Sequence, residues 1–185
     1  MFRQSAKRIA LALAIIACAI GALAQAPLVT LRTTDGRSFD LARSRGKIIV
    51  LLFGATWVPM ADRELPAYQK LADRYAGRNV DFYWVSTNSA KEMEKNSISD
   101  AELQAFARKM GLRLPVLRDP DREAFHAFSL DLLPAIVIID REGRVCLKVL
   151  GFDPEGAEYY DPEKMEFYTT RAYDEVIRCL NQLLK

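Results

Sequence analysis

The chain has 185 residues, of which half are hydrophobic and 27% are charged, and this composition is that of one globular domain with a short appendage. Of its 26 basic side chains, three lie in residues 1–24, which leaves 23 basic against 24 acidic residues in the remainder. This near-neutral charge argues against nucleic acid or an anionic membrane surface as a partner.

The first 24 residues predict an export signal. Three basic residues precede an uncharged apolar run over Ile9–Ala24. The small residues Ala22 and Ala24 suit cleavage before Gln25, and the run is short for a transmembrane helix. The alternative is lipidation at Cys18, and only this alternative would attach the protein to a membrane. We therefore expect an exported protein, located in the periplasm or elsewhere outside the cytoplasm.

A β-hairpin and a buried strand follow the signal. Residues 28–31 and 38–41 alternate in polarity on either side of an Asp-Gly turn, which predicts the hairpin. The run Ile48–Phe53 is apolar, rich in β-branched residues and bounded by glycines, which is typical of a strand buried on both faces. Pro59 then opens a predicted helix that continues to about Tyr75, because its fixed φ suits the first helical position.

The rest of the chain alternates strands and helices and ends in a helix with one apolar face. The predicted elements are a parallel strand at 80–86, a polar loop at 87–97, a helix begun by the Ser99/Glu102 capping box and ended by Gly111, a strand at 114–117, a helix at 122–128 capped by Asp119, strands after Pro134 and at 145–150, a surface loop at 152–168 and a helix at 169–184.

Two segments carry a resemblance to a known family. The first runs from the buried strand through Phe53-Gly54-Ala55-Thr56-Trp57-Val58-Pro59-Met60-Ala61 to Glu64 and Pro66, and the second is Leu133-Pro134 before a buried strand. Both are similar to the active-site signatures of the TlpA-like, or redoxin, branch of the thioredoxin-like thiol-disulfide oxidoreductases. The resemblance covers roughly residues 28–150, the core of a single domain at 25–185.

The resemblance implies a fold and a binding edge. The fold is α/β and thioredoxin-like, with a central mixed β-sheet, helices on both faces and an N-terminal β-hairpin ahead of the central strand. In this family the proline that corresponds to Pro134 is cis, faces the cysteine loop and helps to present a backbone edge that pairs with an extended substrate.

The chain departs from the family where the chemistry takes place. Val58 stands at the position of the attacking cysteine and Ala61 at that of the resolving cysteine, while Gly54 replaces a tryptophan and Met60 a proline. Leu52 stands where related thioredoxins carry a buried acid. Neither valine nor alanine can ionise or form a disulfide, so dithiol exchange is chemically excluded at this loop. We therefore assign no catalytic residue, no cofactor and no metal ligand.

The groove around this loop is the part of the family's site that remains. Its residues are Trp57, Val58, Pro59, Met60, Leu133 and Pro134. The pattern favours a non-catalytic module that binds an unidentified protein or peptide. One alternative is a thiol-disulfide oxidoreductase or antioxidant protein that acts through Cys146 and Cys179, and another is a fold whose site has lost its role. Those two cysteines could also form a structural disulfide or remain separate buried thiols.

Overall fold

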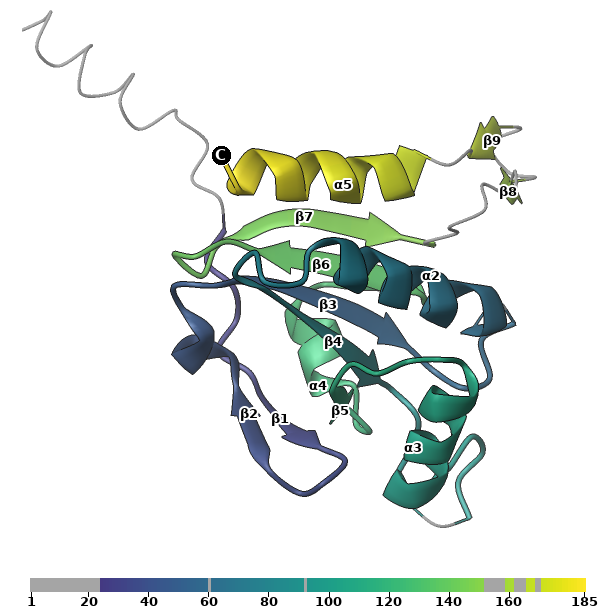
Figure 1. The fold of residues 1–185 in the computed structure, drawn as a ribbon. Coiled ribbons are helices and arrows are strands. Elements are labelled where there is room, and N and C mark those ends of the chain that lie inside the picture. The colour runs from purple at the N-terminus through teal and green to yellow at the C-terminus, as the bar shows by residue number, and fades with distance from the viewer. Residues whose placement is uncertain (1–23, 60, 92, 152–158, 162–165, 169–170) are drawn as a thin grey trace, which may run out of the picture.

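The computed structural model describes residues 24–59, 61–91, 93–151, 159–161, 166–168 and 171–185. Within this part of the chain, seven strands form one mixed sheet in the order β2-β1-β5-β4-β3-β6-β7, and helices cover both of its faces (Figure 1). The predicted architecture of a central mixed sheet preceded by a hairpin is confirmed.

The elements of the described residues have the following bounds. The strands are β1 (Thr30–Thr33), β2 (Ser38–Asp40), β3 (Ile48–Gly54), β4 (Val80–Ser86), β5 (Val116–Arg118), β6 (Ala135–Ile139), β7 (Val145–Leu150), β8 (Tyr159–Asp161) and β9 (Glu166–Tyr168). The helices are η1 (Leu41–Ser44, a 3-10 turn), α2 (Ala61–Arg74), α3 (Asp100–Lys109), α4 (Glu123–Ala127) and α5 (Arg171–Leu183).

Strand β3 lies inside the sheet, between β4 and β6, and all seven of its residues are buried. It pairs in parallel with β4, where Leu51 lies opposite Tyr83, and antiparallel with β6, where Leu51 lies opposite Val137. A strand with neighbours on both sides and cover on both faces reads as a continuous apolar run. The predicted strand with two buried faces is therefore confirmed.

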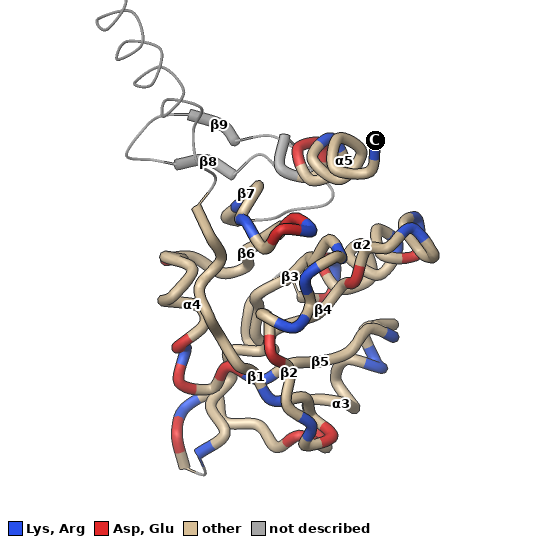
Figure 2. Tube along the Cα trace, turned by 90° about the vertical axis from the view of Figure 1, so that its left-hand side faces the viewer, with Lys and Arg blue, Asp and Glu red and all other residues tan. Residues whose placement is uncertain are grey.

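Alternate residues of β3 enter two separate cores. Ile48, Val50 and Leu52 pack with α2, α3 and α5 on one face. Ile49, Leu51 and Phe53 pack on the other face with α4 and η1. Charged residues of both signs are interspersed over the helices, turns and hairpin, and β3 carries none (Figure 2). The period of two along a strand thus divides the apolar residues between the two layers.

Most of the predicted elements are confirmed, but several boundaries differ. The first strand of the hairpin is Thr30–Thr33 rather than residues 28–31. Helix α2 begins at Ala61 rather than at Pro59, because the amide of Ala61 closes a turn onto the carbonyl of Val58. Strand β5 begins after Pro115, which has no N–H to donate and offers its carbonyl to β4 instead. Helix α4 is shorter than predicted, but the carboxylate of Asp119 accepts from two of its amides as expected.

The predicted surface loop at 152–168 contains two short strands. β8 and β9 pair antiparallel as a separate two-stranded sheet, with Tyr160 opposite Phe167. Strands of three residues are too short to show a polarity period in the sequence, so only the backbone pairing reveals them. The remaining residues of this predicted loop lie outside the described part of the chain.

The described chain begins with a contact to the sheet. The carbonyl of Ala24 accepts a 2.9 Å hydrogen bond from the amide of Val145, and the amide of Ala26 donates to the carbonyl of Gly143 at 2.9 Å. The predicted signal otherwise lies outside the described residues. No helix within those residues is long and apolar enough to cross a membrane.

Gly54, at the end of β3, makes room for a buried tryptophan. A Cβ atom added to Gly54 would lie 2.9 Å from Nε1 of Trp84, which is closer than carbon and nitrogen atoms normally approach. Trp84 lies on the neighbouring strand β4 and is buried. Trp84 on β4 therefore occupies the space that a large side chain at position 54, such as the tryptophan found there in the family it resembles, would need.

We expect Gly54→Ala to lower the free energy of unfolding by about 1–3 kcal/mol, because the added methyl group overpacks this contact. Urea denaturation would measure the change. The same substitution in a Trp84→Phe background should cost less, because the nitrogen atom that it meets is gone. An equal cost in both backgrounds would contradict this assignment of the steric conflict.

Candidate functional site

The candidate site is the loop between β3 and α2. Its backbone is held by two turns, in which the amide of Val58 donates to the carbonyl of Ala55 at 3.2 Å and the amide of Ala61 donates to Val58 at 3.1 Å. Val58 and Ala61 are buried, whereas Trp57 is 43% exposed and Pro59 is exposed. The two positions that the resemblance aligns with cysteines are therefore filled by sealed apolar side chains. Met60 lies outside the described residues.

The second segment of the site reaches the same edge of the sheet. Ala135, which follows Pro134, pairs with Phe53 near the end of β3. The peptide bond between Leu133 and Pro134 is cis, and the carbonyl of Pro134 accepts a 2.8 Å hydrogen bond from Gly151. The register thus brings the loop after β3 and the entry to β6 to one end of the central strands.

Exposed apolar side chains gather at this end. Leu132 is 51% exposed, and Leu150, which lies opposite Ala135 in the β6–β7 register, is 44% exposed. Within the described residues, no hydrogen bond reaches the backbone N–H or C=O of Leu133. An unpaired backbone edge with apolar side chains around it is suited to an extended polypeptide, which would add hydrogen bonds along the edge and bury its own apolar groups.

A buried amide holds the loop in place. The amide group of Asn88, in the segment after β4, accepts from the backbone N–H of Thr56 at 2.9 Å and donates to the Thr56 hydroxyl at 2.9 Å. It also accepts from the hydroxyl of Ser86 at 3.1 Å and donates to the carbonyl of Asn96 at 3.1 Å. Asn88 is buried, so these four bonds fix its position and that of the loop.

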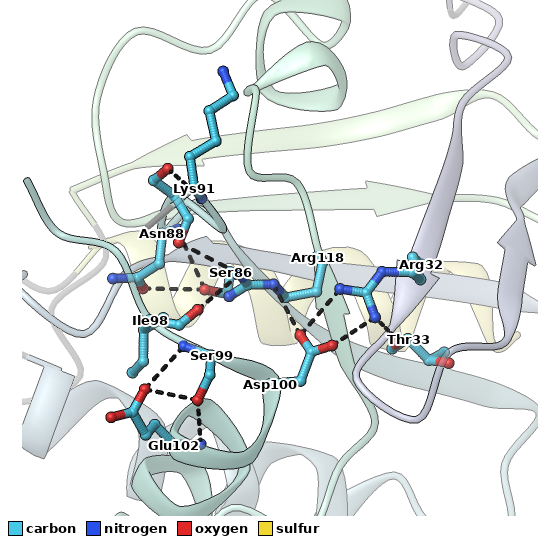
Figure 3. Close-up of polar contacts among 11 residues, drawn as sticks. Arg32, Thr33, Ser86, Asn88, Lys91, Ile98, Ser99, Asp100, Glu102 and Arg118 are labelled. Atoms are coloured by element: carbon cyan, nitrogen blue, oxygen red, sulfur yellow. Dashed lines mark hydrogen bonds and ion pairs between the residues drawn. The ribbon is translucent and has the colours of Figure 1, made fainter. Parts of the chain in front are cut away.

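A buried guanidinium continues this polar network to the hairpin (Figure 3). Nη2 of Arg118 donates to the carbonyl of Ile98 at 3.0 Å, and its Nε lies 3.3 Å from the carboxylate of Asp100. Asp100 also accepts from Arg32 at 2.6 Å, which raises the pKa of Arg32. Burial lowers the pKa of Arg118, and Asp100 opposes this shift. The network ties the segment between β4 and α3 to β1 and to β5.

Sequence reasoning missed the buried polar residues of this region. Glu64, named from the sequence only as part of the first motif, is 2% exposed, on the buried side of the first turns of α2. Sequence reasoning assigned no role to Asn88 or Arg118. The only available signal was their position in the chain, because Asn88 follows β4 and Arg118 is the last residue of β5. The ends of neighbouring parallel strands bring polar side chains to one edge of the sheet.

The two cysteines among the described residues lie away from the site. Cys146 is the second residue of β7, next to the pairing of Val145 with Ile139, whereas Pro134 precedes the opposite end of β6. The four residue steps from Ala135 to Ile139 separate these ends by about 13 Å along the strand. Both Cys146 and Cys179 are half-buried free thiols.

The environment of each thiol disfavours its ionised form. Burial, with the nearby carboxylate of Asp140, raises the pKa of Cys146 to about 11, and burial also raises the pKa of Cys179. Because the thiolate is the nucleophile in disulfide exchange, both thiols are poor nucleophiles at neutral pH. Among the described residues there is no cluster of three potential metal ligands, and His126 is exposed.

Comparison with known proteins matches the chain to a family. The profile of the AhpC/TSA family matches residues 22–147. The thiol-disulfide oxidoreductase ResA of Geobacillus thermodenitrificans is 29% identical over 129 residues, which cover 70% of this chain and 68% of that protein.

Solved structures share the fold. A thiol:disulfide interchange protein of the thioredoxin family from Chlorobium tepidum has a TM-score of 0.64 and 21% identity, covering 90% of this chain and 100% of that one. An exposed lipoprotein thioredoxin from Streptococcus pneumoniae has a TM-score of 0.57 and 24% identity, covering 69% and 91%. These likenesses confirm the predicted thioredoxin-like fold.

We expect Asn88→Ala to loosen the loop, because it leaves the amide of Thr56 without its partner. Hydrogen exchange of that amide should become at least about tenfold faster, and the free energy of unfolding should fall by about 1–3 kcal/mol. Asn181→Ala, which removes a polar contact on α5, is the matched control and should leave the exchange of Thr56 unchanged. Identical exchange rates in the Asn88 variant and the parent would refute the clamp.

Alkylation of Cys146 should depend on pH as its raised pKa requires. Folding raises the pKa of this thiol from its ordinary value of 9.0 to about 11. The raised pKa therefore stabilises the folded state fully below pH 9, and this stabilisation is lost as the pH rises through about 11. With Cys18 and Cys179 replaced by serine, iodoacetamide at pH 8 should react roughly 100-fold more slowly than in urea. A rate that reaches its plateau near pH 9 in the folded protein would contradict the shift.

Proposed function

The chain belongs to the AhpC/TSA family, and we propose that it is an exported, non-catalytic member that binds an extended segment of a protein or peptide beside Pro134. The observation that carries this proposal is the loop after β3. Val58 and Ala61 close it with buried apolar side chains, and neither can form a bond to sulfur. A site without a nucleophile can retain a partner but cannot exchange a disulfide with it.

The surface around the loop supports binding. Trp57, Leu132 and Leu150 expose apolar area at the end of the sheet where the backbone of Leu133 is unpaired. An incoming strand would form backbone hydrogen bonds with Leu133 and bury these side chains, with Trp57 as the largest contact. Apolar residues at the former cysteine positions add to this burial.

The rigidity of the loop also favours binding. Because Asn88 already holds Thr56 through two hydrogen bonds, the loop that carries Trp57 loses little freedom when a partner arrives. Preorganisation of this kind raises affinity by lowering the entropic cost of association.

Catalysis through the remaining thiols has little support in this protein. Cys146 and Cys179 lie toward the other end of the sheet, and the raised pKa of each keeps it protonated. The names of the relatives describe thiol-disulfide enzymes, but a shared fold does not transfer an activity whose reacting atoms are absent.

Export is part of the proposal. Residues 9–24 form an apolar run behind basic residues, and one structural neighbour is described as an exposed lipoprotein. An extracytoplasmic location would bring the groove into contact with exported or unfolded chains.

The proposal predicts that the protein binds an unfolded polypeptide through Trp57. We choose the carboxymethylated B chain of insulin as the probe, because it is extended and has no reactive thiol. Trp57→Ala should weaken binding at least about tenfold, measured by the anisotropy of the labelled peptide. Leu28→Ala is the control, since Leu28 is 84% exposed beside the β6–β7 turn, at the other end of the sheet, and its loss should change nothing.

Two results would overturn the proposal. One is equal binding by the parent and the Trp57 variant. The other is acceleration of insulin reduction by dithiothreitol that disappears in Cys146→Ser, because this would identify a working thiol enzyme.

A further inference from the structure

Cys146 and Cys179 belong to two elements that pack together. Helix α5 runs along β7 (Figure 1) and packs against this strand. Cys179 packs with the core that also contains Leu147 of β7 and the buried residues Val176 and Leu180 of α5. The two cysteines are thus carried by the facing parts of one helix-on-strand contact.

Both cysteines lie at a similar distance from the turn between β6 and β7. The carbonyl of Leu183 accepts a 2.8 Å hydrogen bond from Arg141, which fixes the last turn of α5 near the turn between β6 and β7. Cys179 lies one helical turn before Leu183, about 6 Å further along the helix. Cys146 lies two residues after Arg144, about 6–7 Å further along the strand from the same turn.

A bulge at Cys146 interrupts the alternation of side chains along β7. Simple alternation along β7 would place Cys146 on the face opposite Leu147. The register shifts between Ile138 and Ile139, so that Val145 pairs with Ile139, Leu147 pairs with Ile138, and Cys146 is the extra residue between them. A bulge redirects the side chain of the extra residue. The two thiols also interact electrostatically, since a charge on Cys179 raises the pKa of Cys146.

We propose that Cys146 and Cys179 are a disulfide modification site that fastens α5 to β7. The oxidant is another disulfide, either a small molecule such as glutathione disulfide or a disulfide-bearing oxidase. The thiolate of one cysteine attacks it and releases a first thiol, which leaves a mixed disulfide. The second cysteine attacks the mixed disulfide and releases a second thiol. One disulfide is reduced to two thiols, the protons of the two cysteines pass to these products, and the protein gains one disulfide.

This bond has a structural rather than a catalytic consequence. It closes a loop of about 33 residues that includes β8 and β9, and such closure stabilises mainly by restricting the unfolded chain. It lies toward the other end of the sheet from Trp57 and Pro134, so it leaves the groove unchanged. The inference therefore stands independently of the proposed binding function.

The test uses the full chain with Cys18→Ser. The protein is reduced, equilibrated with mixtures of reduced and oxidised glutathione, quenched with acid and treated with N-ethylmaleimide. We expect both thiols to be lost together, with an intact mass 2 Da below that of the reduced chain and a cross-linked peptide joining Cys146 to Cys179. The oxidised form should have a Tm about 5–10 °C higher.

Two single variants provide the control. Cys146→Ser and Cys179→Ser should each take up one glutathione and show no comparable rise in Tm. Glutathione attached to both cysteines of the parent without an internal bridge, a disulfide-linked dimer in place of the internal bridge, or an internal bridge with an unchanged Tm would each overturn the inference.

Discussion

Burial of β3 on both faces is the constraint on which the rest of the structure depends. A strand with no exposed residue has to be paired on both edges, and β4 and β6 provide this pairing from opposite directions. The pairing with β6 carries the entry of that strand, and with it Pro134, to the end of β3 where the loop begins. The register of one buried strand therefore brings both parts of the candidate site together.

A polar network stabilises what this apolar core positions. Asn88 and Arg118 are buried, and each uses its side chain to hold backbone groups of segments that have no regular structure of their own. Buried polar groups are costly unless they are paired, so such a network specifies one arrangement of the loops around it. The loop that carries Trp57 is thus positioned from two sides, by the end of β3 and by Asn88.

The chemistry of the site follows from the elements that surround it. The loop lies between the end of a buried strand and the N-terminus of a helix, and a helix N-terminus lowers the pKa of a thiol placed there. In this chain these elements surround Val58 and Ala61, which have no proton to lose. Among the described residues, Cys146 of β7 and Cys179 of α5 are half-buried, and burial disfavours their ionisation. The loop at the helix N-terminus therefore carries no thiol, and the two described thiols lie where burial keeps them protonated.

The sequence by itself determined the order and type of most elements, because apolar periodicity, the Ser99 capping box and the glycine and proline positions are local signals. It also determined that no thiol chemistry is available at the loop after β3. Only the tertiary structure decided that Glu64, Asn88 and Arg118 are buried, that β8 and β9 pair, and that the β6–β7 pairing has a bulge at Cys146. These features depend on contacts between residues far apart in the chain, and the burial of a polar side chain leaves no local pattern.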